Sequence, residues 1–149
     1  MKSFISHKDE YENYLNESSS EPEEKVWKNW RKLVNMSLTE LEEFYDSPDG
    51  KDAGMKQSDA NRAGIDSGRE SARWLMKMIP IGETYKKAEE NWTPTMWKWC
   101  RKQISFNSRM RGMRKRMVGN PFERDGKKTR WYKSLLIWGH DPRKPLRKI

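Results

Sequence analysis

The stretch from Thr93 to Met117, TPTMWKWCRKQISFNSRMRGMRKRM, constrains the fold most because it carries a complete set of helix signals. Thr93 is a typical N-cap, and Pro94 suits the first position of a helix. Uncharged residues then recur on one side, and from Trp99 onward they are spaced by steps of four and three, as on a buried helix face. The members of this stripe are Met96, Trp99, Gln103, Phe106, Met110, Met113 and Met117. We therefore expect a helix whose Trp99 and Phe106 lie in the core.

Four further segments show helical spacing or helix start signals, and they cover residues 22–36, 37–47, 58–79 and 129–138. Ser37 and Glu40 stand in capping-box positions, and Thr129 is a candidate N-cap. Ser58 would cap the third segment, although its glycines leave a loop around residues 64–68 as a competing interpretation. The sequence thus predicts an all-α fold, a compact bundle of about four or five helices with a flexible N-terminal arm and a basic C-terminal tail.

Three regions are expected along the chain. Residues 1–22 form a flexible acidic arm, residues 23–139 form a helical domain whose half from residue 92 is basic, and residues 140–149 form a basic tail. The core must be small, because 34% of the residues are hydrophobic and 36% are charged. Eight Trp, five Tyr and four Phe compensate, since each aromatic ring buries a large area. The same aromatic content argues against a wholly disordered chain.

The compartment is also constrained by the sequence. No apolar run approaches the roughly 20 residues that a membrane span requires, so no membrane partner is expected. The N-terminal sequence has no signal-peptide core and turns acidic at once. The single cysteine, Cys100, excludes an internal disulfide and suits a reducing compartment. Together these features predict a cytoplasmic protein.

Charge is divided unevenly along the chain. Residues 1–90 hold 14 basic and 19 acidic side chains, a net charge of −5, whereas residues 91–149 hold 17 basic and 3 acidic side chains, a net charge of +14. Such asymmetry is typical of a polyanion-binding half joined to a half that folds, docks or regulates. A second interpretation stays open, in which the two halves simply attract each other.

The basic half combines cations with aromatic rings in a way that favours nucleic acid. Eight Lys or Arg residues lie between Lys98 and Met117, and no Asp or Glu occurs from Thr93 to Phe122. A solvated helix face normally mixes both signs of charge, whereas cations placed on phosphates release condensed counterions and bind. Arginine is favoured further because its planar fork pairs with phosphate oxygens. The pattern continues in RDGKKTRWYK and suits single strands, but it does not separate DNA from RNA.

We therefore predict that the chain binds DNA or RNA through thirteen residues. The predicted phosphate contacts are Lys98, Arg101, Lys102, Arg109, Arg111, Arg114, Lys115, Arg116, Lys127, Lys128 and Arg130. Two aromatic residues, Trp97 and Trp131, are predicted to stack on bases, because Trp97 lies off the buried stripe and Trp131 stands among cations.

No pattern supports catalysis, a bound metal or a cofactor. A zinc finger is excluded by one cysteine and two distant histidines, His7 and His140. A Cys100–His140 nucleophile pair is conceivable, but Cys100 lies beside the apolar stripe and is predicted to be a core residue. The loop GNPFERDGKKT half resembles a phosphate-binding P-loop, yet its glycine spacing is wrong and no strand precedes it. We therefore assign no catalytic residue and no metal ligand.

Several segments carry a resemblance that extends over the whole chain. The opening MKSF with acidic residues close behind, and the segments SGRESARWLMKM, RKQISFNSRMRG and KSLLIWGHDPRK, resemble the small uncharacterised basic proteins of large tailed phages of marine bacteria. This resemblance implies production in a bacterial host cytoplasm and is compatible with a place in the virion. It implies no activity and no catalytic residue.

Three functions follow, in order of support. The first is a non-enzymatic nucleic-acid-binding protein that grips the phosphate backbone with a basic helix and loop. The second is a protein-interaction module, a phage structural or host-takeover factor, that docks its basic face on an acidic partner or on a second copy of the chain. The third is a nuclease-type enzyme, which no set of residues demands.

Overall fold

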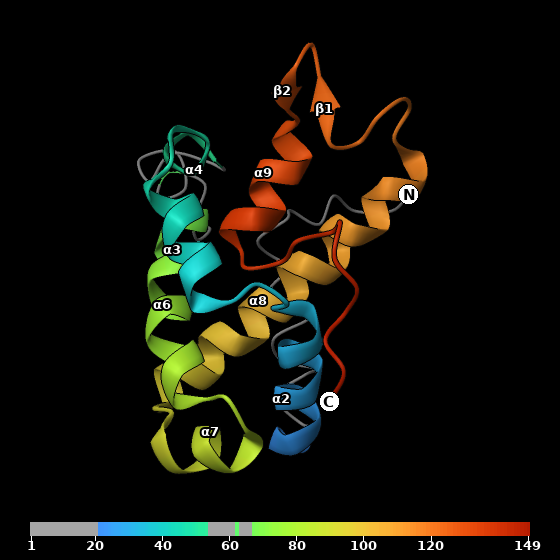
Figure 1. Ribbon diagram of the computed structural model, residues 1–149. Coiled ribbons are helices and arrows are strands. Elements are labelled where there is room, and N and C mark those ends of the chain that lie inside the picture. Colours follow the sequence, from blue (N-terminus) through green and yellow to red (C-terminus); the bar gives the residue numbers. More distant parts are fainter. Residues whose placement is uncertain (1–20, 54–61, 63–66) are drawn as a thin grey trace.

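The computed structural model describes residues 21–53, 62 and 67–149, and in them nearly every regular element is a helix (Figure 1). The elements are α2 (Glu23–Leu33), α3 (Leu38–Asp46), α4 (Pro48–Asp52), α6 (Gly68–Ile81), α7 (Tyr85–Asn91), α8 (Pro94–Gly112), η1 (Met113–Arg116, a 3₁₀ helix), β1 (Glu123–Arg124), β2 (Lys127–Lys128) and α9 (Arg130–Ile137). The predicted all-α fold is therefore confirmed. The expected flexible arm, residues 1–22, lies outside the described residues apart from Glu21 and Pro22.

Polar residues at the helix starts act as the sequence predicts. The Ser37 hydroxyl accepts a hydrogen bond from the backbone N–H of Glu40, whose carboxylate accepts one from the backbone N–H of Ser37. Thr93 caps α8, with Pro94 at the first position, and Thr129 caps α9. Because the first N–H groups of a helix have no partner within it, these side chains determine where each helix begins.

The helix predicted to run unbroken from Ser58 is interrupted at Ser67, within the stretch of residues 64–68 for which a loop was the competing interpretation. Ser67 has an extended backbone, with φ of −83° and ψ of 152°, and its hydroxyl accepts a hydrogen bond from the N–H of Glu70. Helix α6 therefore begins at Gly68, while Ser58 itself lies outside the described residues. A Cβ on Gly68 would lie 2.6 Å from Cγ2 of Ile137, so this glycine allows α9 to approach α6 closely.

Two short helices, α4 and α7, are missed by the sequence pattern. Pro48 and Gly50 are stop signals for α3, yet the Ser47 hydroxyl accepts a hydrogen bond from the N–H of Gly50 and starts a new turn. Thr84 caps α7 in the same way, by accepting from the N–H of Lys87. Helices of five and seven residues are too short to show an apolar period, which is the main signal in a sequence.

Helix α8 runs diagonally across the molecule (Figure 1). Helices α2, α6 and α9 each pack against α8, and α9 also packs against α6. Helix α3 contacts both α6 and α9, which joins the N-terminal half of the bundle to its last helix. The C-terminal end of α8 continues into η1 and reaches outward from the bundle (Figure 1).

Tryptophan rings fill the space where α2 meets α8 and the segment before it. The ring of Trp92 packs edge-on against those of Trp30 and Trp97, with centroids 4.8 and 4.9 Å apart. Trp27 Nε1 donates a hydrogen bond of 2.9 Å to the carbonyl of Gly82. Buried indoles usually find such a partner for their N–H group. The small core is therefore rich in aromatic rings and is held by hydrogen bonds as well as by packing.

Gln103 joins three helices through one buried side chain. Its Oε1 accepts a hydrogen bond of 2.8 Å from Trp30 Nε1 of α2, and its Nε2 donates one of 3.3 Å to the Ser71 hydroxyl of α6. All three residues have 0% of their surface exposed. A buried polar group that loses its partner is costly, so this amide determines how α2 and α6 face α8.

Replacement of Gln103 by Met keeps the size of the side chain but leaves the buried N–H of Trp30 without an acceptor. We expect the free energy of unfolding to fall by about 1–3 kcal/mol for this orphaned donor. A second change, Trp30→Phe, removes the donor, so the double variant should lose less than the sum of the two single variants. Urea denaturation of all four proteins measures the coupling, and additive losses would contradict this role of the hydrogen bond.

His140 is buried where the chain leaves α9. It is 1% exposed, its Nδ1 lies 2.6 Å from the carbonyl oxygen of Leu33, and its Nε2 has no partner in the described structure. Burial lowers the pKa of His140, and the nearby positive charge of Arg111 lowers it further, while the Leu33 carbonyl and Asp141 oppose the shift. The ring is therefore neutral in the folded state, with its Nδ1–H donating to Leu33.

This buried ring makes the stability of the protein depend on pH. Between about pH 6.5 and the lowered folded pKa, the unfolded chain binds a proton at His140 that the folded chain does not, so the free energy of unfolding should fall as the pH decreases through this range. The slope reaches at most about 1.4 kcal/mol per pH unit for one proton. The variant His140→Gln keeps a hydrogen-bond donor but cannot titrate, so it should lack this component. Denaturation of both proteins across this range tests it, and parallel curves would refute it.

Candidate nucleic-acid interface

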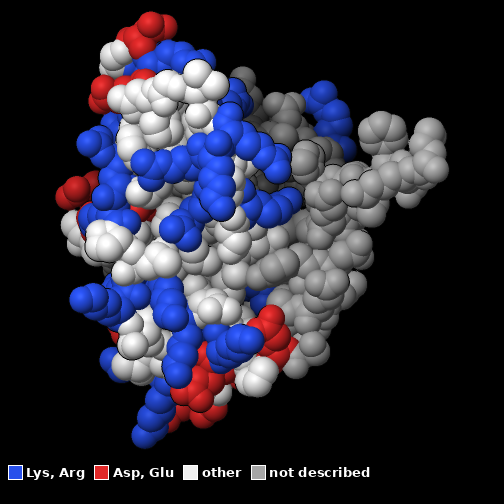
Figure 2. All heavy atoms as spheres, turned by 90° about the vertical axis from the view of Figure 1, so that its right-hand side faces the viewer, with Lys and Arg blue, Asp and Glu red and all other residues white. Residues whose placement is uncertain are grey.

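The end of α8 and helix η1 present five of the eleven predicted phosphate-contacting cations to solvent. Five exposed side chains form what we call the basic surface: Arg109, Arg111, Arg114, Lys115 and Arg116. Figure 2 looks at the side of the molecule on which η1 lies, and it shows many Lys and Arg side chains gathered there. Lys98, near the other end of α8, is also exposed.

Two of the predicted cations, Arg101 and Lys102, are half-buried and contribute to packing. The Arg101 guanidinium donates a hydrogen bond of 3.3 Å to the carbonyl of Trp97. The Lys102 ammonium lies 4.4 Å from the ring centroid of Trp99, a cation–π contact. These two residues are therefore weaker candidates for a ligand than the basic surface.

The loop after η1 contains a small hairpin that sequence reasoning did not predict. Strands β1 and β2 are antiparallel and are joined by Asp125 and Gly126, whose φ values are 55° and 75°. Both residues adopt the left-handed conformation that an Asp-Gly turn of a tight hairpin requires, so this dipeptide is the signal that could have revealed it. Lys127 and Arg130 are exposed on the hairpin and at the start of α9, as a ligand contact would need.

Ion pairs join the basic half of the chain to the acidic half. Lys128 of β2 pairs with Asp49 of α4 at 3.2 Å, and Lys133 of α9 pairs with Asp52 of α4 at 2.7 Å. Such partly exposed pairs contribute little stability, roughly 0–1 kcal/mol each. On the side of the molecule where β2 and α9 face α4, these pairs support the interpretation that the two halves of the chain attract each other. Lys128, a predicted phosphate contact, is thus already engaged.

The other side of the molecule differs. In the described residues, no carboxylate pairs with Arg111, Arg114 or Lys115. These three side chains surround an open hollow of about 310 Å³ between the end of α8, α9 and the segment that follows α9. The residues that line it are Ser108, Arg111, Gly112, Arg114, Lys115, Trp131 and Pro142. The hollow is therefore a concave site whose charged groups are all positive.

Hydrogen bonds and contacts of aromatic side chains hold the residues around this hollow in place. Trp131 Nε1 donates a hydrogen bond of 2.6 Å to the carbonyl of Met110, which joins α9 to the end of α8. The guanidinium groups of Arg114 and Arg143 each lie 5.1 Å from the ring centroid of Phe122. Phe122 in turn lies 6.0 Å from Trp131, measured between ring centroids. Arg114 is thus positioned by packing, which lowers the entropy that ligand binding would cost.

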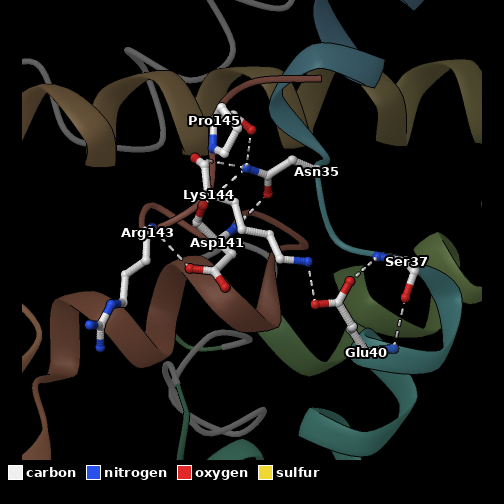
Figure 3. Close-up of polar contacts among 7 residues, drawn as sticks. All are labelled: Asn35, Ser37, Glu40, Asp141, Arg143, Lys144 and Pro145. Carbon is white, nitrogen blue, oxygen red and sulfur yellow. Dashed lines mark hydrogen bonds and ion pairs between the residues drawn. The ribbon is translucent and has the colours of Figure 1, made fainter. Parts of the chain in front are cut away.

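The wall at Pro142 belongs to the predicted basic tail, and Asn35 anchors this segment (Figure 3). Asn35 Oδ1 accepts a hydrogen bond of 2.7 Å from the N–H of Asp141, and Asn35 Nδ2 donates to the carbonyls of Asp141 and Pro145 at 2.9 and 3.2 Å. The Lys144 ammonium points toward Glu40 of α3 and forms an ion pair with it (Figure 3). This pair also lowers the pKa of Glu40. The segment is therefore a fixed part of the fold up to Pro145.

The expectation that Trp97 and Trp131 offer exposed rings is wrong. Their side chains are 7% and 6% exposed, and Trp97 packs against Trp92. The reason is that α8 is covered on more than one side, because Trp97, Cys100, Ile104 and Asn107 form a second buried stripe beside the predicted one. These residues are spaced by three and four, as on a buried helix face. Because Lys98, Arg101 and Lys102 lie between them in the sequence, this side of the helix was predicted to face solvent.

Replacement of Trp97 by Ala separates a core role from a stacking role. Because the ring is buried, we expect the free energy of unfolding to fall by about 3–5 kcal/mol, the usual cost of removing a large core aromatic. Urea denaturation measures this loss. A variant that unfolds at the same urea concentration as the unchanged protein would show that the ring does not belong to the core.

Other kinds of site have little support in the described residues. Cys100 is 0% exposed, and burial raises its pKa well above the ordinary value, so it is a protonated core thiol as predicted. No group of three or more Cys, His, Asp or Glu side chains in this part of the chain could hold a metal ion. None of the helices described is long and apolar enough to cross a membrane.

Comparison with known proteins gives one match. A family model described as "Protein of unknown function (DUF3140)" matches residues 29–136, a range that begins in the middle of α2 and ends one residue before the end of α9. No curated protein and no solved structure matches the chain.

Proposed function

The chain belongs to the DUF3140 family of proteins of unknown function, and from its surface we propose that it is a non-enzymatic nucleic-acid-binding protein. The observation that carries this proposal is the basic surface, five exposed cations on the last turn of α8 and on η1. A run of thirty residues without a carboxylate, from Thr93 to Phe122, surrounds them in the sequence. Cations gathered on one surface attract a polyanion.

The position of these cations supports contacts to phosphates rather than to bases. They lie on an outward-reaching helix end, so their long side chains can follow a backbone of regularly spaced charges. The two rings proposed for stacking are buried, which removes the feature that favoured recognition of bases. Contacts of this kind give affinity without sequence preference, since every nucleotide carries the same phosphate. The resemblance to phage proteins would place this binding in the cytoplasm of an infected bacterium.

An acidic protein partner is the second candidate. The ion pairs of Lys128 with Asp49 and of Lys133 with Asp52 show basic side chains of this chain meeting carboxylates of a short helix. An acidic helix of another protein, or of a second copy, could meet the basic surface in the same manner. Nucleic acid remains the better candidate because guanidinium groups form the majority of this surface and suit phosphate oxygens.

Charge reversal on the basic surface tests the proposal. We expect Arg109→Glu with Arg116→Glu to weaken binding of labelled single- and double-stranded DNA and RNA. The slope of log affinity against log salt should become shallower by about 0.7–0.9 for each phosphate that the variant no longer binds. Fluorescence anisotropy at several salt concentrations measures both quantities.

The matched control reverses two exposed lysines on α7, Lys86→Glu with Lys87→Glu, which changes the net charge equally at a distance from η1. If the control loses as much affinity as the test variant, binding follows net charge and not this surface. If the unchanged protein binds none of the four nucleic acids even at low salt, the proposed function is wrong.

A further inference from the structure

We propose that the hollow beside the basic surface binds the terminal phosphate of a nucleic-acid strand, a phosphate monoester. The inference rests on the proposed nucleic-acid binding and names the part of the ligand that the concave site recognises. It is carried by the charge, the shape and the fixed walls of the hollow.

Charge distinguishes a terminal phosphate from an internal one. An internal phosphodiester carries one negative charge, whereas a terminal monoester carries about 1.5 to 2 near neutral pH. The hollow collects Arg111, Arg114 and Lys115 around one space, and no described carboxylate pairs with them. Three cations that converge on one phosphate match the greater charge, while cations spread along a surface match a series of single charges.

The donors at this site are of the kinds that a phosphate monoester requires. Two guanidinium groups can each give two parallel N–H bonds to phosphate oxygens, and the Lys115 ammonium adds a point charge. Ser108, an exposed residue on the wall, supplies a hydroxyl that can donate a further hydrogen bond. A monoester has three terminal oxygens to accept these bonds, one more than the non-bridging pair of a phosphodiester.

The size of the hollow suits the end of a strand. Its volume of about 310 Å³ is near the lower limit for small-ligand sites, which suits a phosphate with part of its sugar. Pro142, which is half-buried, offers an apolar surface against which the terminal sugar can pack, and the mostly buried Trp131 lies at the same wall. Hydrogen bonds from Asn35 hold the segment that carries Pro142, and the Trp131–Met110 bond holds the other side. Both walls are therefore in place before a ligand binds, which lowers the entropy cost of binding.

The test compares oligonucleotides of one sequence that differ only at their ends. The full-length protein is titrated with labelled single strands that carry a 5′-phosphate, a 3′-phosphate or hydroxyls at both ends. We expect a phosphorylated strand to bind about tenfold more tightly than the hydroxyl strand, since charge-assisted hydrogen bonds to the added charge are among the stronger ones. The variant Arg111→Gln with Lys115→Gln should remove this ratio, because both side chains line the hollow.

The matched control is Arg109→Gln with Arg116→Gln, which removes the same charge from the basic surface but outside the hollow. This control should weaken all three strands and preserve their ratio. Equal binding of all three strands to the unchanged protein would overturn the hollow as an end-binding site and leave the proposed function standing. Failure of every strand to bind at low salt would overturn the proposed function itself.

A free nucleotide has the same phosphate chemistry, so one more arm separates the two sources. A nucleoside 5′-monophosphate should bind far more weakly than the phosphorylated strand, because the strand also contacts the basic surface. If the mononucleotide binds as tightly as the strand, the assignment to a strand end is wrong. Circular dichroism of each variant establishes that it is folded before binding is compared.

Discussion

The buried amide of Gln103 is the interaction on which the arrangement of the molecule depends. The core packs tryptophan rings among aliphatic side chains such as Leu41, Leu75 and Ile137. Buried polar groups that are fully hydrogen-bonded select one arrangement of such a core, because other arrangements would leave them without partners. Gln103 is hydrogen-bonded in two directions, to Trp30 on α2 and to Ser71 on α6. Both partners must be satisfied together because all three groups are excluded from water. This double requirement sets the rotation of α8 about its axis, and thereby which of its residues face the solvent.

The rotation of α8 explains why its two ends differ. Up to Asn107, two adjoining stripes of the helix are covered by α2, α6 and α9, so even cations such as Arg101 and Lys102 are half-buried. Beyond Asn107 the bundle ends and the helix continues with little cover, and Met113 of the predicted apolar stripe is 48% exposed. One continuous helix therefore supplies core at its beginning and a basic surface at its end. The proposed nucleic-acid binding therefore requires no separate domain.

Much of this fold could be predicted from the sequence, because its signals are local. The starts of α3, α8 and α9 are each marked by a capping residue whose hydrogen bond spans only three residues, namely Ser37, Thr93 and Thr129. The spacing of apolar residues around Trp99 likewise predicts a buried face. The site was less predictable because it depends on contacts between distant segments. Whether Trp97 faces a ligand or the core is decided by Trp92, and whether Lys128 meets phosphate or Asp49 is decided by where α4 lies. Charge and composition identified the basic half of the chain. That Lys128 and Lys133 of this half pair with carboxylates of α4 could be recognised only from the tertiary structure.

The anchoring of the segment around Asp141 by Asn35 has a consequence for the order in which the protein is made. Synthesis proceeds from the N-terminus, so α2, α8 and η1 exist before α9 and the segment that carries Pro142. A growing chain that has reached η1 already displays the cations, but it has no Trp131 and no Pro142 to close the hollow around them. Such a chain carries the positive charge of the proposed site without its walls. Asn35 is synthesised before the segment around Asp141 that it binds. The hollow is therefore complete only after that segment has been made and has formed its hydrogen bonds with Asn35.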